Sequence, residues 1–457
     1  MEKKNNIRLS TMQLLAAGFL GIILLGGILL WLPISNTRPI SFVDALFTAV
    51  TSVCVTGLVT VTPAVQFTVF GKIIILILIQ VGGLGIVACV TAFFLIMRKR
   101  ISLKERIVIR EAYSMDSLSG MVAMIIRILK GTFLVEGIGA LFYAIQFVPE
   151  YGFAKGIAYS VFHAVSAFCN AGIDILGDSS LIPYAGNVVV NFTTIFLIIL
   201  SGLGFLVWQD LLQNFKSLWK KEINGRKFFQ KLRLHTKVVL VMTGILIVAG
   251  TLDFLILEYH NPGTIGTMSF GQKLMASLFH SVSTRTAGFA TVPQGELTPA
   301  TMFTTCFLMF IGGSPGGTAG GVKTTTIAMM ILCCITILKN RKDVECFGRR
   351  VQWENIRIGI CIVFLAFAIL FTGTTLITVF EGNSSFLEIL YEATSAIGTV
   401  GLSTGLTSGL CTTSKFVVMV MMYIGRIGPV TFVLAFASGK KTKDSHRQLP
   451  VQGILIG

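Results

Sequence analysis

Charged residues are scarce in this sequence. Only 13% of its 457 residues are Asp, Glu, Lys or Arg, whereas 53% are hydrophobic, and the mean hydropathy is +0.80. An ordinary soluble protein covers itself with a polar and charged surface, and this composition excludes that class. The sequence therefore predicts an integral membrane protein, whose length is best counted in spans of about 20 residues.

The residue patterns that most catalytic and metal sites need are also missing. The chain has only five histidines, and none of its nine cysteines stands at a zinc-ligand spacing from one of them. It also lacks a nucleophile elbow and paired carboxylates within its apolar runs. We therefore expect no enzymatic activity and no organic cofactor, and we expect the cysteines to be buried free thiols.

Acidic residues are outnumbered by basic ones, 21 to 37, and the formal net charge is +16. Such a charge can indicate nucleic-acid binding, but here 29 basic residues are spread over five segments beside the apolar runs. These are 3–8, 98–130, 216–237, 339–357 and 440–447. The positive-inside rule places these segments and both termini in the cytoplasm. We predict a multi-pass protein of a bacterial cell membrane, without a secretory signal or nucleic-acid partner, whose basic face suits membrane lipid or a regulatory protein.

Long and short apolar runs alternate along the chain. The long runs, read as eight spans, are 12–33, 70–97, 122–148, 187–213, 236–257, 301–337, 356–380 and 414–438. The short runs are 42–53, 157–169, 272–284 and 386–397. Each short run is too short to cross about 30 Å of hydrocarbon as a helix. We predict four re-entrant helices, which are tolerated where protein or a water-filled cavity satisfies their backbone groups.

The four short runs form an internal repeat. They read ALFTAVTSVCVTGL, SVFHAVSAFCNAGI, SLFHSVSTRTAGF and ILYEATSAIGTVGL. An aromatic residue precedes a glycine by ten, ten, nine and ten residues, and the glycines recur at intervals of 115, 116 and 113 residues. Such regularity indicates a repeated structural unit, although the third copy is one residue shorter.

The repeat predicts an all-α integral membrane fold of four tandem helix–pore-loop–helix units around a pseudo-fourfold axis. The units are residues 1–110, 111–230, 231–345, which contains a glycine-rich broken span, and 346–457. Because the basic segments join one unit to the next, the short helices should all lie on the outer side.

A ring of backbone carbonyls can replace the water shell of a monovalent cation without adding fixed charge. Glycine allows consecutive carbonyls to turn toward one axis, and the helix ends before it favour a cation there. The predicted filter residues are Val55, Thr56, Gly57, Leu58, Asn170, Ala171, Gly172, Ile173, Thr286, Ala287, Gly288, Phe289, Thr399, Val400, Gly401 and Leu402. The alternative is that the four glycines only permit hairpin turns.

These repeats resemble those of the Trk/Ktr/HKT superfamily of potassium transport proteins, over essentially the whole chain. The eight-span length is most similar to the Ktr membrane subunits, the KtrB group. The resemblance implies K+ as the transported ion, with Na+ dependence, a homodimer, and control by a cytosolic nucleotide-binding RCK ring of the KtrA type. It also associates glycine at the position of Gly57 with K+ preference. None of the four copies reads TVGYG, which puts strict selectivity in doubt.

A second glycine-rich segment interrupts the sixth long run. Seven of its ten residues are Gly or Pro, so a continuous helix is excluded. It is not a phosphate-binding loop, because Val322 separates Gly321 from Lys323. It is either a simple kink or, as the resemblance implies, an intramembrane gate below the filter. Its residues are Gly312, Gly313, Ser314, Pro315, Gly316, Gly317, Thr318, Ala319, Gly320 and Gly321.

Five ionisable side chains lie within or directly beside the apolar runs and need an interpretation. Arg426 lies near the middle of a span, so it either pairs with an acid or, as the resemblance implies, projects into the pore as a barrier. Lys323 is either a polar contact of the gate or a snorkelling lysine. Arg285 is expected to pair with Glu392 or Asp174, and the matching histidines, His163 and His280, are expected to pack or form hydrogen bonds.

Two classes of transport remain open. The first is a gated K+ translocation subunit. The second is a Na+-coupled symporter with alternating access, although such folds usually contain inverted repeats and the units here share one predicted orientation.

Overall fold

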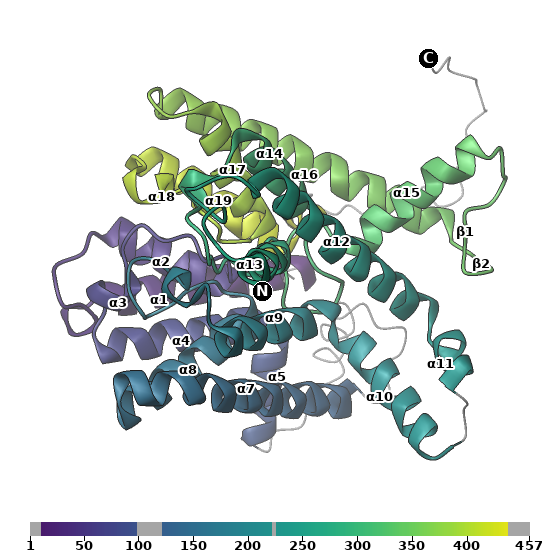
Figure 1. The fold of residues 1–457 in the computed structure, drawn as a ribbon, viewed down its shortest axis with the longest axis horizontal. Helices are drawn as coiled ribbons and strands as arrows, with labels where there is room; N and C mark the ends of the chain where they lie inside the picture. The colour runs from purple at the N-terminus through teal and green to yellow at the C-terminus, as the bar shows by residue number, and fades with distance from the viewer. Residues whose placement is uncertain (1–10, 98–120, 222–224, 437–457) are drawn as a thin grey trace, which may run out of the picture.

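The protein is described here by a computed structural model that covers residues 11–97, 121–221 and 225–436, and these residues are mainly helical (Figure 1). The first unit contains α1 (Thr11–Trp31), η1 (Pro33–Ser35), α2 (Phe42–Cys54), α3 (Pro63–Gln66), α4 (Val69–Leu84) and α5 (Ile86–Ile96). The second contains α7 (Met121–Tyr151), α8 (Phe153–Cys169), η2 (Ile182–Tyr184), α9 (Val188–Leu203) and α10 (Phe205–Trp219).

The second half of the chain repeats this order. After α11 (Gly225–Lys231), the third unit contains α12 (Leu234–Glu258), α13 (Phe270–Ser283), η3 (Gln294–Glu296), α14 (Pro299–Phe310), α15 (Thr324–Leu338), β1 (Glu345–Cys346) and β2 (Arg349–Arg350). The fourth contains α16 (Trp353–Phe380), α17 (Phe386–Gly398), α18 (Leu406–Gly409), α19 (Thr412–Ile427) and α20 (Pro429–Phe436). Each unit therefore has a long first helix, a short helix and an interrupted second segment.

Four of the described helices, α1, α7, α12 and α16, are long and apolar enough to cross a membrane. The α9–α10 pair passes the same test together but is bent by 97°, which gives up to five such spans. The remaining apolar helices of the described residues are shorter; α2 and α8 are short helices of the repeat, whereas α4, α14 and α15 belong to interrupted second segments. Uninterrupted long helices are thus fewer than the eight expected spans.

Single glycines divide three of the runs that the sequence predicted as continuous spans. Gly85 separates α4 from α5, Gly204 separates α9 from α10, and Gly428 separates α19 from α20. Their φ angles are 84°, 91° and 96°, which side chains other than glycine rarely adopt. The expected interruption of the third unit lies between Phe310 and Thr324. The interruption is therefore a feature of every unit and is not confined to the third.

The short helices pack in a closed cycle. Within each unit, α2, α8, α13 and α17 contact their own first helix, and each also contacts the second segment of the preceding unit. Thus α4 packs on α8, α9 on α13, α14 on α17, and α19 of the last unit returns to α2 of the first. The repeat aromatics Phe47, Phe162, Phe279 and Tyr391 are all buried in this arrangement. The four units therefore surround one axis.

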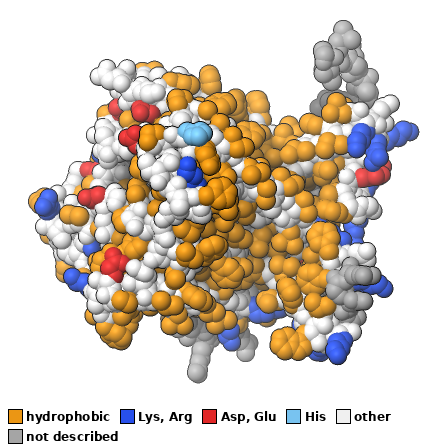
Figure 2. Space-filling model, in the orientation of Figure 1, with side chains coloured by type: hydrophobic (Ala, Val, Ile, Leu, Met, Phe, Trp, Pro, Cys, Tyr) orange, Lys and Arg blue, Asp and Glu red, His pale blue; other side chains and the backbone are white. Residues whose placement is uncertain are grey.

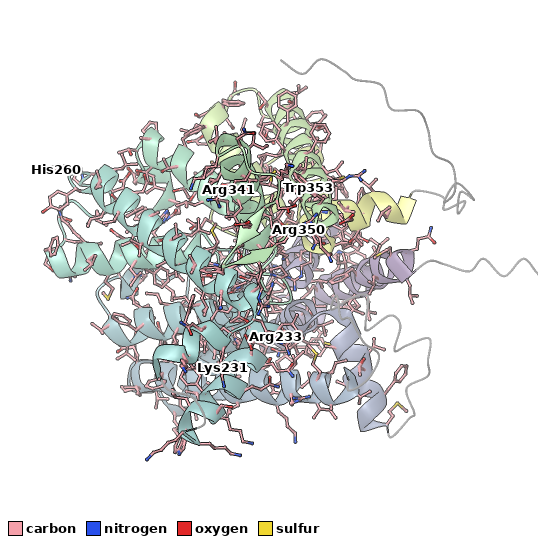
Figure 3. All side chains as sticks on the ribbon, turned by 90° about the vertical axis from the view of Figure 1, so that its right-hand side faces the viewer. Lys231, Arg233, His260, Arg341, Arg350 and Trp353 are labelled. Carbon is pink, nitrogen blue, oxygen red and sulfur yellow. The ribbon has the colours of Figure 1, made fainter. Side chains whose placement is uncertain are left out.

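Charged side chains lie mainly toward two ends of the molecule, with apolar side chains between them (Figure 2). Acidic side chains stand among some basic ones at the end with α2, α3 and α18, whereas basic side chains predominate around α11 and the β1–β2 hairpin. Figure 3 looks onto the basic end, where Lys231, Arg233, Arg341 and Arg350 lie. The basic segments 3–8, 440–447 and most of 98–130 lie outside the described residues, as do both termini.

Two expectations need correction. The fold is not purely helical, because Glu345 and Cys346 pair with Arg350 and Arg349 in a small antiparallel hairpin. All nine cysteines are free thiols as expected, but only some of them are buried. The exposed ones are Cys334, Cys361 and Cys411.

Candidate functional site

The four short helices lead into the same backbone conformation. In each unit a residue in the left-handed region stands two residues before the repeat glycine; it follows the helix directly in the first, second and fourth units, whereas in the third unit Thr284 and Arg285 come between. The left-handed residues are Val55, Asn170, Thr286 and Thr399, with φ of 54°, 59°, 68° and 51°. The third copy follows the same rule, so its missing residue lies in the helix end and not in the loop. The four predicted filter segments therefore share a left-handed residue two positions before the glycine.

The repeat glycines, Gly57, Gly172, Gly288 and Gly401, meet at the axis, and we call them the glycine ring. A methyl group added to Gly57 would lie 3.2 Å from the Cα atoms of both Gly172 and Gly401. A methyl group on Gly288 would lie 3.1 Å from the same two Cα atoms. The ring therefore has no room for a side chain, and its four φ angles are all positive.

Backbone carbonyls connect the ring in chain order. A methyl group added to Gly57 would lie 2.7 Å from the carbonyl oxygen of Ala171, and one on Gly172 would lie 2.7 Å from that of Ala287. On Gly288 it would meet the carbonyl of Val400, and on Gly401 that of Thr56, which closes the cycle. Four carbonyl oxygens, one from each unit, therefore stand beside the glycines. Oxygens arranged in this way can coordinate a dehydrated cation.

Buried hydroxyl groups on the short helices form hydrogen bonds with the backbone of the ring glycines or of the residues that follow them. The Thr51 hydroxyl accepts a hydrogen bond from the Gly57 amide at 2.9 Å, and the Ser395 hydroxyl accepts one from Gly401 at 2.9 Å. Ser166 donates to the carbonyl of Ile173 at 2.6 Å, and Ser283 donates to that of Phe289 at 2.5 Å. The sequence analysis missed these residues, although a Ser or Thr stands one helical turn before the loop in every repeat.

We expect Thr51→Val to destabilise the protein by about 1–3 kcal/mol, because it leaves the buried Gly57 amide without its acceptor. Thr51→Ser should retain most of the stability. Thr56→Val is the matched control, since within the described residues the Thr56 hydroxyl is buried and has no hydrogen-bond partner. Thermal unfolding in detergent measures the difference. Equal losses for Thr51→Val and Thr56→Val would contradict a bracing role for Thr51.

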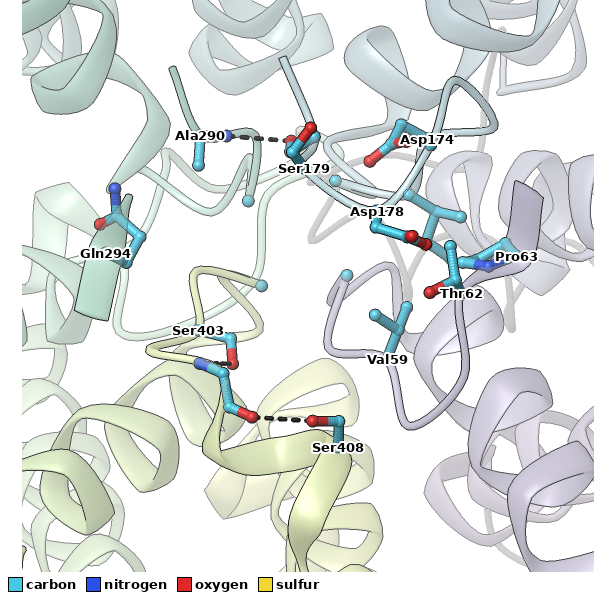
Figure 4. A pocket seen from close by; sticks show the side chains of 18 of the residues that line it. Val59, Thr62, Pro63, Asp174, Asp178, Ser179, Ala290, Gln294, Ser403 and Ser408 are labelled. Carbon is cyan, nitrogen blue, oxygen red and sulfur yellow. Dashed lines mark hydrogen bonds between the residues drawn. The ribbon is translucent and has the colours of Figure 1, made fainter. Parts of the chain in front are cut away.

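A cavity of about 320 Å³ opens on the acidic side of the glycine ring (Figure 4). Loops from all four units line it, and they contribute Thr62, Asp174, Gln294 and Ser403 among others. Of the described residues that line it, Asp174 and Asp178 are the charged ones, and both are acidic. Burial raises the pKa of Asp174 to about 6, so its carboxyl group is mostly ionised at neutral pH. The cavity therefore attracts cations toward the ring.

The segment Gly312–Gly321, the glycine-rich loop, leaves α14 and reaches across to the second unit. The Ser314 amide donates to the carbonyl of Gly202 at 3.0 Å, and the Phe205 amide donates to that of Gly316 at 3.0 Å. The Thr318 hydroxyl donates to the carbonyl of Phe168, at the end of α8, at 3.2 Å. The loop is thus attached both to the α9–α10 break and to the helix that precedes the second filter segment.

Two basic side chains bind the carbonyls of this region. Arg426 donates to the carbonyls of Thr318, Gly82 and Gly83, and so links the glycine-rich loop to the end of α4. Lys323 donates to the carbonyl of Ala319 at 2.7 Å and to that of Gly320 at 3.3 Å. Lys323 therefore makes a polar contact within the loop, in line with the first of its two expected roles.

The expected ion pair of Arg285 is wrong. Its guanidinium lies 3.3 Å from the hydroxyl of Thr243 on α12, and neither Glu392 nor Asp174 is among the ion pairs of the described residues. Glu392 instead accepts hydrogen bonds from Ser403, Thr404 and Thr407, and so fixes the loop after the fourth filter segment. These hydroxyl and amide donors satisfy the Glu392 carboxylate, so it does not need an arginine as a partner.

The two repeat histidines do pack and form hydrogen bonds, as expected. The Nδ1 atom of His163 lies 2.7 Å from the carbonyl of Tyr159, and its ring packs against that of Phe147. The Nε2 atom of His280 lies 3.1 Å from the hydroxyl of Thr305, and its ring centroid is 4.2 Å from that of Phe254. Among the described residues there is no His, Cys, Asp and Glu cluster that would hold a metal.

The helix breaks share a short pattern that the sequence analysis also missed. The breaks read GGLG at 82–85, SGLG at 201–204 and GRIG at 425–428. Arg426 occupies the position that Gly83 and Gly202 hold in the other units. It is therefore an exception within a repeated pattern of small residues, and comparison of the four units would have revealed it.

Comparisons with known proteins identify the family of this chain. Residues 10–444 match the TrkH family model, described as a cation transport protein. The chain is 39% identical over 451 residues to the Ktr system potassium uptake protein B of Bacillus subtilis, covering 99% of this chain and 98% of that protein. It is 38% identical to the potassium/sodium uptake protein NtpJ of Enterococcus hirae, covering 100% and 99%.

A solved structure shows the same fold. The crystal structure of the potassium transporter TrkH from Vibrio parahaemolyticus aligns with a TM-score of 0.70 and 16% identity, over 96% of this chain and 87% of that one. The family match extends over nearly the whole chain, including the glycine ring and the glycine-rich loop. This chain is therefore a member of the TrkH family of cation transport proteins.

Proposed function

We propose that this chain is the ion-translocating membrane subunit of a potassium uptake system. The observation that carries the proposal is the glycine ring, in which four units each place a backbone carbonyl beside the next unit's glycine. Such oxygens bind a monovalent cation without fixed charge. The acidic cavity supplies cations from one side, and the glycine-rich loop with Arg426 acts as the gate on the other. In this proposal the eight expected spans are four continuous helices and four interrupted ones.

The proposal includes Na+ as a second cation that affects transport. One relative is called a potassium/sodium uptake protein, which supports this part. A Na+-coupled symporter with alternating access is the alternative. The cyclic packing of four like units around one axis favours a single pore, because alternating access usually uses inverted repeats.

Control by other subunits completes the proposal. One relative belongs to a Ktr system, a name that implies several components. We infer a homodimer of the membrane chain and a cytosolic nucleotide-binding ring of the RCK type on the basic end of the molecule. This orientation puts the basic end in the cytoplasm of a cell whose plasma membrane the protein spans.

Flux through purified protein in liposomes tests this function. We expect K+ or Rb+ to enter in preference to Na+, measured with and without a Na+ gradient. Uptake that needs no Na+ gradient supports a gated channel, whereas uptake that stops without the gradient supports coupling. Vesicles that stay inert even with the regulatory ring present would refute the transport proposal.

A further inference from the structure

Residues of α7 and α10 line a groove that none of the predicted filter residues borders. Figure 1 shows α7 and α10, and α10 begins directly after the break at Gly204. The volume of the groove is about 250 Å³. Apolar side chains, among them Ile128, Trp208 and Leu212, form most of its lining, and Arg127 and Lys216 line it from the two helices. Acidic side chains are absent from the described residues that line it.

The floor of the groove is fixed by local contacts. The Trp208 indole donates to the carbonyl of Leu200 at 2.7 Å, which sets the direction of its ring. Gly131 of α7 lies directly against that ring, because a methyl group there would stand 3.3 Å from it. Leu212 is 67% exposed on the outside of the molecule, so the apolar floor continues to the lipid-facing surface.

This combination suits one class of ligand. An anionic phospholipid has acyl chains that match the apolar floor and a phosphate that matches two cations. A soluble anion would use the cations but gain nothing from the apolar part of the groove. Anionic lipids of a cytoplasmic leaflet attract Lys and Arg by about 1 kcal/mol each.

Two residues that line the groove also contact the glycine-rich loop or the helix end to which the loop is bonded. Phe205 lines the groove, and its amide donates to the carbonyl of Gly316 at 3.0 Å. Trp208 packs edge-on against Phe168, whose carbonyl accepts from the Thr318 hydroxyl. Anything that fixes α10 against α7 therefore also fixes both attachment points of the loop.

We propose that this groove binds an anionic phospholipid, with its phosphate between Arg127 and Lys216 and an acyl chain on the apolar floor. Bound lipid stabilises the loop contacts seen here and so lowers basal ion flux. The binding site stands on the groove itself, whereas its effect on flux rests on the proposed function.

Binding is tested on the full-length protein in detergent, which removes the membrane surface. A short-chain phosphatidylglycerol should raise the unfolding temperature, and the phosphatidylcholine of the same chain length should not. Each charge removed should weaken lipid binding about fivefold. In the R127Q/K216Q double variant, the phosphatidylglycerol concentration that gives half of the maximal temperature shift should therefore rise roughly 25-fold. The K220Q/K221Q variant removes two exposed lysines of the neighbouring turn, beyond the groove, and should bind as the parent does.

Leu212→Trp provides a second variant that keeps both charges and fills the groove. It should unfold at the parent temperature and no longer respond to phosphatidylglycerol. Equal responses to both lipids, equal protection by inorganic phosphate alone, or an equal loss in K220Q/K221Q would each overturn the site.

Flux is the second readout: phosphatidylglycerol in the vesicles should lower basal Rb+ uptake of the parent but not of R127Q/K216Q. If no variant conducts in any lipid, the proposed function fails while the binding result still stands.

Discussion

Arg426→Ala is expected to raise basal K+ flux at least tenfold in vesicles that lack any regulatory subunit. The guanidinium now binds carbonyls of both the glycine-rich loop and the end of α4, so its removal releases the loop. In the proposed pore, the substitution also removes a positive charge that costs about 2.5–3.5 kcal/mol at membrane depth and would repel passing cations. A tenfold change corresponds to about 1.4 kcal/mol, well within the loss of these contacts. Radioactive Rb+ uptake measures the effect.

Two variants show whether the charge or the contact matters. Arg426→Lys keeps the charge but loses the forked geometry, so its flux should lie between those of the parent and the alanine variant. Tyr423→Phe, less than one turn away on α19, removes only a hydrogen bond to the carbonyl of Ala16 and should leave flux unchanged. If Arg426→Ala conducts as the parent does, Arg426 is a structural contact and the gate lies elsewhere.

Gly57→Ser should reduce the preference for K+ over Na+ by at least tenfold. The serine Cβ would stand 2.7 Å from the Ala171 carbonyl, on a backbone whose φ is 100°. Such a contact forces a shift of the carbonyl, and the left-handed backbone adds about 1–2 kcal/mol of strain. In the proposed filter, the displaced carbonyl oxygens would then no longer match one ion size. Competition of Na+ with Rb+ uptake gives the preference directly.

Gly177→Ala is the control for this experiment. Gly177 lines the same outer cavity, but an added methyl group there would meet nothing within 4 Å, and its φ is not positive. Flux and preference should therefore stay at the parent values. A Gly57→Ser protein that folds and retains the parent preference would remove the glycine ring from the list of selectivity determinants.

The recurrence of the four repeat glycines could be read from the sequence because the constraint on them is local. Gly57 and its three counterparts need positive φ angles and have no room for a Cβ atom, so the same residue recurs in every unit. The shorter third copy did not disturb this register, because the left-handed Thr286 still precedes Gly288 by two residues. Backbone conformation therefore explains why the filter segments could be aligned without a structure.

Other features were not predictable in the same way. Gly85, Gly204 and Gly428 stand in apolar runs where single glycines are common, so a break was not distinguishable from a tolerated glycine. The contact between Arg285 and Thr243 joins two elements 42 residues apart, and the sequence offered acids as equally good partners. Side-chain partners between separate helices depend on packing that a hydrophobicity pattern does not specify.

The contact between the first and last units has a consequence for biosynthesis. Lys415 pairs with Asp44 at 2.7 Å across 371 residues, and α19 packs on α2. Contacts of such large sequence separation form late, because the chain between them must be ordered first. A chain that is still emerging from the ribosome, or one that ends before α19, therefore lacks the contacts that close the ring of four units.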